Sequence, residues 1–239
     1  MIKPAKLTRF VFLFFMFPAA VHADVHTSSS CDRGAVAYAI SQASDGDTVL
    51  IPAGTSVWTA QLTITKGIVL KGAGIDQTII IDDTPVSNSV PFSVAVPAGK
   101  IFRLCHLNLQ GWDGVNYPNG GVYNAIAITS GEGSTWRVDH CKFVNLCKVF
   151  ALSNTSNALI DNCTWWEEKF AGTGNIQTCT LHGLGHTDYS KPLILGTSNA
   201  AFFEDNYVCF SGTAANSANR PWIDNHGGSK LVIRHNNII

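Results

Sequence analysis

A six-residue strand pattern recurs along this chain and limits the folds that it can adopt. Each copy has apolar first and sixth positions, a polar pair at positions two and three, and Cys or Asn at position four. Four copies begin at Val138, Ile160, Phe203 and Ile233, and a looser fifth copy begins at Leu104. The four begin 22, 43 and 30 residues apart, which we interpret as one coil, two coils, and one coil with an insertion. Repetition at this period is typical of a solenoid.

The spacing of the apolar positions predicts a corner inside each copy. Positions one and six lie five residues apart, so an unbroken strand would point them to opposite faces of a sheet. Both reach one core only if the chain bends between them, and we expect the bend at position four. Asn206 and Asn236 stand there, and Asn tolerates left-handed backbone better than most residues. Stacked on neighbouring coils, these side chains can also hydrogen-bond to one another, so each copy is expected to form strand, corner and strand of a β-helix.

The segment before the repeats indicates an all-β stack closed by one short helix. Apolar residues recur at helical spacing between Cys31 and Ser44, and a turn at 45–47 ends that helix. Short β-type runs follow without a helix between them, over residues 48–51, 62–64, 68–70 and 79–81. Parallel strands without crossover helices have one common solution, a coil stacked on itself. We expect the helix to cover the first coil and hide its unpaired strand edge.

Several motifs between Ala35 and Asp82 resemble those of a known family. They are Gly46-Asp47-Thr48-Val49, Pro52-Ala53-Gly54, Trp58, Leu62-Thr63-Ile64 and Leu70-Lys71-Gly72-Ala73-Gly74. This stretch resembles the opening of right-handed parallel β-helix proteins of the pectin lyase-like superfamily, and the later repeats resemble those of its exported bacterial and phage members. The resemblance implies a right-handed parallel β-helix over nearly all of the mature chain. It implies no single activity, because the superfamily holds lyases, hydrolases, esterases, epimerases and non-catalytic adhesins.

The first 23 residues are typical of an export signal. Three basic side chains precede an apolar run over residues 10–17, and Ala23 ends a stretch of small or apolar residues that signal peptidase accepts. The run is too short to span a membrane, so we expect cleavage near Ala23 and a secreted or periplasmic protein. Residues 24–239 then form one β-helix domain. Because its last repeat ends without a partner strand or a cap, we expect this domain to be incomplete at its C-terminus.

The charge of the chain argues against nucleic acid or an anionic membrane as a partner. It carries 16 Lys and Arg against 17 Asp and Glu, and the export signal removes three of the cations. Both kinds of partner call for basic patches. We therefore expect a polysaccharide substrate or ligand, no nucleic acid and no membrane span, and we leave the oligomeric state open.

Seven cysteines in an exported chain suggest disulfides at first sight. However, Cys141 and Cys163 hold position four of successive copies, so they would stack about 4.8 Å apart. Parallel side chains at that spacing suit the geometry of a disulfide poorly. We favour buried thiols that pack as small hydrophobic side chains.

The stretch Trp136-Arg137-Val138-Asp139-His140 resembles the Trp-Ile-Asp-His stretch of pectate lyases, with Arg137 inserted. That family cleaves acidic polysaccharide by β-elimination, with Ca²⁺ held by Asp and Glu and with Arg as the base. By this resemblance Asp139 and Asp161, which would stack on adjacent coils, are candidate Ca²⁺ ligands. The ion takes about six to eight oxygens, so one Asp does not make a site. The alternative is a solvated ladder of outward acids, with Lys142 offsetting their repulsion.

The densest polar cluster lies late in the chain and supplies our candidate catalytic residues. They are Glu204, Asp205, Asp224, His226, Arg234 and His235. Positions two and three of the last two repeats should place an acid beside a base-capable residue on consecutive coils. Asp224 and His226 fall between those repeats, in a Gly-rich loop that a sugar chain could approach. An Arg or His base beside carboxylates is what β-elimination from a uronate needs, and the alternative is an Arg–Glu ion pair that braces two coils.

Aromatic side chains complete the candidate site. Trp112, Trp166 and Trp222 are expected to stack on sugar rings, as amphipathic aromatics do at binding surfaces. Trp165 occupies apolar position six, where stacking inside the core is an equal alternative. The sequence thus predicts an exported, polysaccharide-active β-helix protein, with a lyase acting on acidic polysaccharide as the first hypothesis and Ca²⁺ as its candidate cofactor. A non-catalytic carbohydrate-binding, adhesin or tailspike-like surface protein is the alternative.

Overall fold

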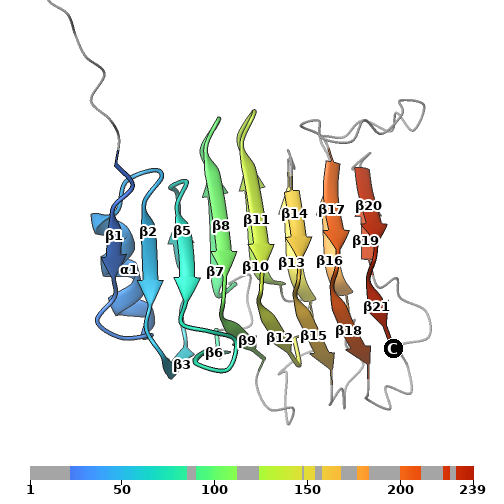
Figure 1. Cartoon of the computed structure of the whole chain (residues 1–239), viewed down its shortest axis with the longest axis horizontal. Helices are drawn as coiled ribbons and strands as arrows, with labels where there is room; N and C mark the ends of the chain where they lie inside the picture. The colour runs from blue at the N-terminus through green and yellow to red at the C-terminus, as the bar shows by residue number, and fades with distance from the viewer. Residues whose placement is uncertain are drawn as a thin grey trace, which may run out of the picture.

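One helix and a long stack of parallel strands make up the described part of the chain (Figure 1). The computed structural model describes residues 22–84, 90–111, 124–146, 148–153, 158–167, 177–182, 200–210, 223–226 and 230–239. Over these residues, none of the helical structure is both long and apolar enough to cross a membrane.

The described strands form three parallel sheets of eight, seven and six strands. Sheet 1 contains β1 (Val25–Thr27), β2 (Thr48–Ile51), β5 (Val69–Gly72), β8 (Ile101–Cys105), β11 (Thr135–Asp139), β14 (Ala158–Asp161), β17 (Ala200–Glu204) and β20 (Lys230–Arg234). Sheet 2 contains β3 (Gly54–Trp58), β6 (Thr78–Asp82), β9 (Asn108–Gln110), β12 (Lys142–Val144), β15 (Thr164–Glu167), β18 (Tyr207–Phe210) and β21 (Asn237–Ile238). Sheet 3 contains β4 (Leu62–Ile64), β7 (Phe92–Val96), β10 (Asn124–Ser130), β13 (Lys148–Ser153), β16 (Gln177–His182) and β19 (Ile223–His226).

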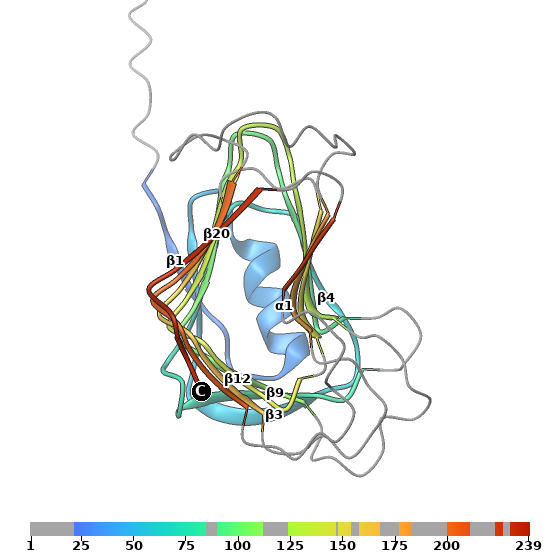
Figure 2. The same ribbon diagram turned by 90° about the vertical axis from the view of Figure 1, so that its right-hand side faces the viewer.

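Successive turns of the chain visit the three sheets in the same order and stack on one another. Viewed along the stack, the sheets enclose a common interior (Figure 2). This arrangement confirms the predicted all-β class and the right-handed parallel β-helix. The interpretation of the 43-residue gap as two coils is wrong, because β14 pairs directly with β17 and places Ile160 beside Phe203. That gap is one coil with a long connection.

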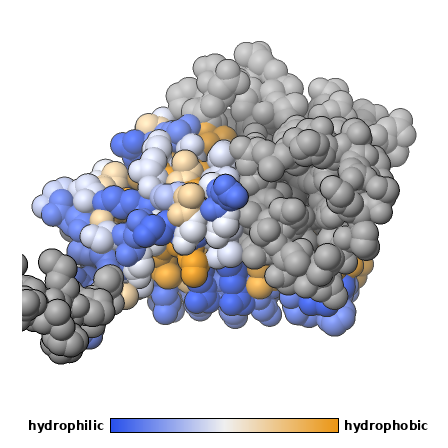
Figure 3. All heavy atoms as spheres, turned by 90° about the horizontal axis from the view of Figure 1, so that it is seen from above, coloured by the Kyte–Doolittle hydropathy of each residue, from blue (hydrophilic) through white to orange (hydrophobic). Residues whose placement is uncertain are grey.

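Positions one and six of the pattern face the core, as predicted. Val138, Phe143 and Phe203 are fully buried, and Trp165 packs at a tilt between Phe143 and Phe203 with ring centroids 5.1 and 5.0 Å away. The core alternative for Trp165 is therefore correct. In the last described coil, by contrast, Ile233 is 48% exposed. Seen from above, the described surface is mainly hydrophilic, with smaller hydrophobic areas between (Figure 3).

The corner of each repeat lies at position three, one residue before the expected place. Backbone φ is between +51° and +60° at His106, His140, Asn162, Asp205 and His235. This left-handed region is unfavourable for most side chains, and Asn, Asp and His are the non-glycine residues that enter it most often. The corner therefore selects the residue types found at position three.

Position four turns inward and forms a polar and thiol ladder inside the stack. Asn206 donates from Nδ2 to Asn236 Oδ1 and to the Ile160 carbonyl, both at 3.0 Å, and its Oδ1 accepts the Cys163 N–H at 2.9 Å. The expected hydrogen bonding between stacked asparagines is thus confirmed. Cys141 and Cys163 are buried free thiols, as we favoured.

Helix α1 (Arg33–Gln42) covers the N-terminal end of the core (Figure 2), where the sequence predicted it. Its Val36, Ala39 and Ile40 are buried. The Lys66 ammonium donates to the carbonyls of Ile40, Ser41 and Ala43 at 2.8, 3.0 and 2.6 Å, so it supplies a charged donor to the carbonyl groups at the end of the helix. The first coil is therefore closed by a helix whose own end is pinned to it.

Replacing Asn206 by Ala is expected to lower the free energy of unfolding by about 3 kcal/mol. The change leaves the buried Cys163 N–H and Ile160 carbonyl without their side-chain partner, and each such loss costs roughly 1–3 kcal/mol. Urea unfolding followed by circular dichroism measures this. Asn237→Ala, at an exposed position in the next coil, is the matched control and should change stability by less than about 0.5 kcal/mol. Equal losses in the two variants would show that the ladder contributes little.

Candidate functional site

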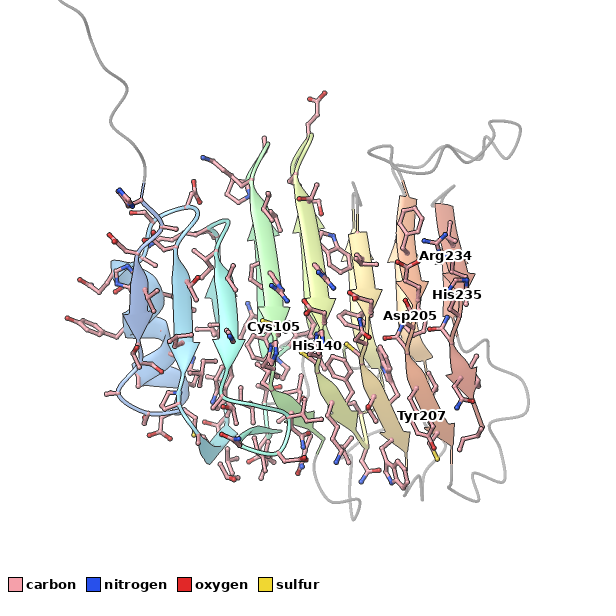
Figure 4. The ribbon with its side chains drawn as sticks, in the orientation of Figure 1. Cys105, His140, Asp205, Tyr207, Arg234 and His235 are labelled. Atoms are coloured by element: carbon pink, nitrogen blue, oxygen red, sulfur yellow. The ribbon has the colours of Figure 1, made fainter. Side chains whose placement is uncertain are left out.

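Positions two and three of the repeats line up along the outside of the stack. At position two, strand register places Cys105, Asp139, Asp161, Glu204 and Arg234 in one row. The corner residues of position three form a second row beside it, which we call the corner row: His106, His140, Asn162, Asp205 and His235. Figure 4 shows Cys105 and His140 near the bend of the middle strands and Asp205, Arg234 and His235 at the bend of the last ones. Each coil adds one residue to each row, about 4.8 Å from the last.

Two arginines hold the acids of the position-two row. Arg103 donates from Nε and Nη2 to the two Asp139 oxygens at 2.7 and 2.6 Å. Arg137 does the same to Asp161 at 2.8 and 2.6 Å, and its Nε also lies 3.4 Å from Asp139 Oδ1. The Asp139 side chain is fully buried while the arginines are 36% and 38% exposed. Each arginine thus reaches from one coil to an acid of the next.

The ion pairs shift the pKa values of both partners. Hydrogen bonding to Asp139 raises the pKa of Arg103, and hydrogen bonding to Asp161 raises that of Arg137. Burial opposes ionisation of Asp139, but hydrogen bonds from Arg103 and His140 outweigh it and keep the pKa of this carboxyl below its usual value. Both arginines are therefore firm cations and Asp139 is a firm anion at neutral pH.

The candidate calcium ligands do not fit that ion as they are arranged. Asp139 and Asp161 do stack in register, but each carboxylate is occupied by an arginine fork. A Ca²⁺ ion would have to displace two cations to reach about six oxygens. Within the described residues no group of three His, Cys, Asp or Glu side chains could hold a metal. Their position also differs from the expected solvated ladder, because both acids are buried and paired with Arg rather than with Lys142.

An aspartate–histidine pair occupies the second place in these rows. His140 Nδ1 lies 2.7 Å from Asp139 Oδ2, and the His140 side chain is 50% exposed. With Asp139 ionised, Nδ1 carries the proton and donates it, so Nε2 is the atom left to accept one. An exposed imidazole oriented by a buried carboxylate is suited to general base chemistry.

A second imidazole stacks on His140 from the preceding coil. The rings of His106 and His140 are 5.0 Å apart and nearly parallel, at 5°. Burial, and then the nearness of His140, lowers the pKa of His106. This histidine therefore adds a neutral ring, not a charge, beside His140 near neutral pH.

Sequence reasoning missed His106, His140 and Arg103 as site residues. The signal was present for the two histidines, because both hold position three of the repeat and His140 directly follows Asp139. For Arg103 no local signal exists, since it reaches Asp139 across a gap of 36 residues.

The late cluster is assembled in part as predicted. Arg234 Nε donates to Glu204 Oε2 at 2.5 Å, with the pair in register on β20 and β17. In the corner row, His235 Nδ1 lies 3.8 Å from Asp205 Oδ1 and both side chains are exposed. The hydrogen bond that Arg234 donates to Glu204 raises the pKa of Arg234. Arg234 is thus held as a cation and is poorly suited to remove a proton.

The other predicted catalytic residues lie on a different sheet. Asp224 and His226 belong to β19, in sheet 3, whereas Glu204 and Arg234 belong to sheet 1. The expectation of a loop at these two positions is therefore wrong for their backbone. Their side chains are outside the described part of the structure, as are Trp112 and Trp222 entirely. Trp166 is half-buried on β15, in register with Val144 and Cys209.

Comparisons with known proteins add little to this geometry. No protein-family model and no curated protein matches the chain. Among solved structures, a pectin methylesterase mutant in complex with a hexasaccharide is similar with a TM-score of 0.35 and 12% identity, covering 82% of this chain and 81% of that one. An alginate lyase from Paenibacillus sp. str. FPU-7 is similar with a TM-score of 0.25 and 10% identity, covering 90% and 99%. The fold therefore rests on the three sheets themselves, and membership of the pectin lyase-like superfamily stays a prediction.

Replacing Arg103 by Met is expected to destabilise the protein by about 2–3 kcal/mol at pH 7. It leaves the buried Asp139 carboxylate with only Arg137 and His140 nearby, and breaking such a pair costs roughly 3–5 kcal/mol where no other partner remains. Because the pKa of folded Asp139 is depressed, this stabilisation is present above about pH 4, the unfolded value, and is lost as pH falls through the folded one.

Urea midpoints of wild type and Arg103→Met at pH 7 and pH 3 measure this effect. The difference between the two proteins should shrink at the lower pH. Lys100→Met is the matched control, since Lys100 pairs at 3.3 Å with the partly exposed Asp45 and should contribute less than about 1 kcal/mol. A difference that stays constant with pH would show that Arg103 acts through packing instead of through Asp139.

Proposed function

We propose that this chain is an exported polysaccharide-active protein that binds an acidic polysaccharide along the corner row and cleaves it by β-elimination. The observation that carries the proposal is the Asp139–His140 pair, with His140 half exposed and Arg103 and Arg137 beside it. This set combines a positioned base with nearby cations on the outer side of a corner.

The cations support binding of a uronate carboxylate. A guanidinium has five N–H donors, and the forks to Asp139 and Asp161 use two donors of each arginine. Both side chains remain more than a third exposed. Each guanidinium therefore has N–H donors left with which to bind a second carboxylate, one that belongs to the polysaccharide. Because the rows advance by about 4.8 Å per coil, an extended sugar chain that lies along them meets polar side chains of the corner row at each coil.

His140 supports the chemical step. In β-elimination the base takes the proton from the carbon next to the uronate carboxylate. The electron pair left behind forms a carbon–carbon double bond, the bond to the glycosidic oxygen on the neighbouring carbon breaks, and that oxygen takes up a proton from water. In the proposal His140 Nε2 accepts the proton, Asp139 stabilises the resulting imidazolium, and the arginines offset the growing charge on the carboxylate.

In this proposal the late cluster binds a further part of the polysaccharide along the same rows. Glu204, Asp205, Arg234 and His235 lie at the end of the rows, and Arg234 is held by Glu204 in a form suited to binding an anion. The rival assignment of catalysis to this cluster would use His235 as the base, with Asp205 as its partner at 3.8 Å. Asp224 and His226 are kept as candidates from the sequence, and Trp112, Trp166 and Trp222 as sugar-stacking residues.

One observation favours the non-catalytic alternative. All five residues of the corner row have positive φ, and this constraint alone selects Asn, Asp or His. Histidine at position three then needs no catalytic role, and the chain would act as a carbohydrate-binding surface protein.

Turnover on a panel of acidic polysaccharides separates these alternatives. Purified mature protein is incubated with pectate, alginate and glycosaminoglycans, with and without added Ca²⁺, while the ultraviolet absorbance of the unsaturated product is followed. His140→Asn keeps a residue that tolerates the left-handed corner but removes the base, so it should lower the rate at least about 100-fold. His235→Asn makes the same change at the matched corner of the last coil and should stay within a few-fold of wild type.

The other outcomes of this experiment are equally informative. The reverse pattern, with His235→Asn inactive, would move the base to the late cluster. Binding to one of the glycans without any unsaturated product would contradict the lyase and support the carbohydrate-binding alternative. Loss of activity on chelation of Ca²⁺ would contradict the poor fit of the arginine-paired acids to that ion.

A further inference from the structure

The buried Asp47 carboxylate accepts a hydrogen bond from the backbone N–H of Asp24, the residue that follows the predicted cleavage site. Asp24 N lies 2.8 Å from Asp47 Oδ1, and the Thr48 N–H donates to the Asp24 carbonyl at 2.8 Å. The Asp47 side chain is only 7% exposed. Both the N–H and the carbonyl of Asp24 are thus hydrogen-bonded, the first to the turn before β2 and the second to the first residue of β2.

Asp47 has donors but no permanent cation. Its Oδ2 accepts the Ser44 N–H at 2.6 Å and lies 3.2 Å from His26 Nε2. Within the described residues, no Lys or Arg side chain reaches ion-pair distance of it. Hydrogen bonds from the backbone of Ser44 and Asp24 keep the pKa of Asp47 below its usual value, so it is ionised at neutral pH. Buried carboxylates in proteins are normally paired with a positive charge.

We propose that hydrolysis of the Ala23–Asp24 bond places a new α-ammonium group on Asp47, so that removal of the export signal also stabilises the fold. In this step water adds its hydroxyl to the Ala23 carbonyl carbon, the carbon–nitrogen bond breaks, and the Asp24 nitrogen gains the proton. An α-amino group with a usual pKa of about 8 is then protonated at neutral pH. A neutral amide donor becomes a charged one at the same atom, without movement of the chain.

The surroundings suit an ammonium group. Ala23 and Asp24 are exposed, so the two N–H bonds that do not face Asp47 can reach water. Hydrogen bonds with a charged donor and a charged acceptor are roughly twice as strong as neutral ones. The small residue Ala23 is also what signal peptidase requires on the N-terminal side of its cut. This stabilisation of the fold does not depend on any activity on polysaccharide.

Mass spectrometry of the exported protein and a comparison of two chain starts test this inference. The exported protein should begin at Asp24. Purified chains that begin at Asp24 and at an extra Gly-Ala before it are then unfolded in urea at pH 7. The Asp24 start should have a folding equilibrium constant roughly tenfold larger, because it alone places a charged donor on Asp47.

A second pair of chains isolates the role of Asp47. In the Asp47→Asn background the two starts should be equally stable. Asp45→Asn is the matched control, since Asp45 is an acid of the same turn but binds the Gly67 N–H and Lys100. In that background the tenfold difference should remain. A mature chain that begins elsewhere, equal stability of the two starts, or a difference that survives Asp47→Asn would each overturn the inference.

One measurement needs no variant and holds even if Asp47→Asn fails to fold. The α-amine of the folded mature protein should be acetylated at least about tenfold more slowly than that of the same protein in urea, because a paired ammonium is a poor nucleophile. Peptide mass spectrometry measures both rates. Equal rates in the folded and unfolded protein would contradict the pairing.

Discussion

The left-handed residue at position three is the constraint on which the rest of this β-helix depends. It turns the chain between sheet 1 and sheet 2, so that Val138 and Phe143 can face one core although they stand five residues apart. Because the turn recurs in every repeat, the sheet 1 strands of successive repeats end in register with one another. The corner therefore creates the stacked rows inside and outside the fold.

Those rows raise an electrostatic problem that the arginines solve. Asp139 and Asp161 are buried neighbours of like charge in adjacent coils, and such pairs repel. Arg103 and Arg137 each donate two hydrogen bonds to the acid of the next coil, so the charges alternate along the stack. The same forks hold Asp139 as an anion against His140. Stability of the coils and orientation of the exposed imidazole thus come from one network.

Much of this architecture could be predicted because the repeat is local. The apolar positions, the capping helix and the stacked Asn206 and Asn236 all follow from residues within one copy or one segment. The bend was expected one residue late, since Asn suits both a left-handed corner and an internal ladder, and the pattern alone does not separate the two. At position four the Asn206 amide is buried and fully bonded, while at position three His and Asp also occur. The gap before Phe203 was also misinterpreted. A gap of that length can be filled either by two coils or by one coil with a long connection, and the sequence alone does not separate the two.

The site was harder to predict than the fold because its contacts cross between coils. Arg103 and Asp139 are 36 residues apart in sequence, yet their atoms lie 2.6 Å apart. Position three supplies histidines to the surface for backbone reasons alone, and so the residue type carries little information about function. The neighbour decides: His140 has a buried, arginine-held carboxylate 2.7 Å away, whereas His235 faces an exposed one at 3.8 Å. Pairing to a fixed anion, not the presence of an imidazole, is what distinguishes a candidate base from a corner residue in this solenoid.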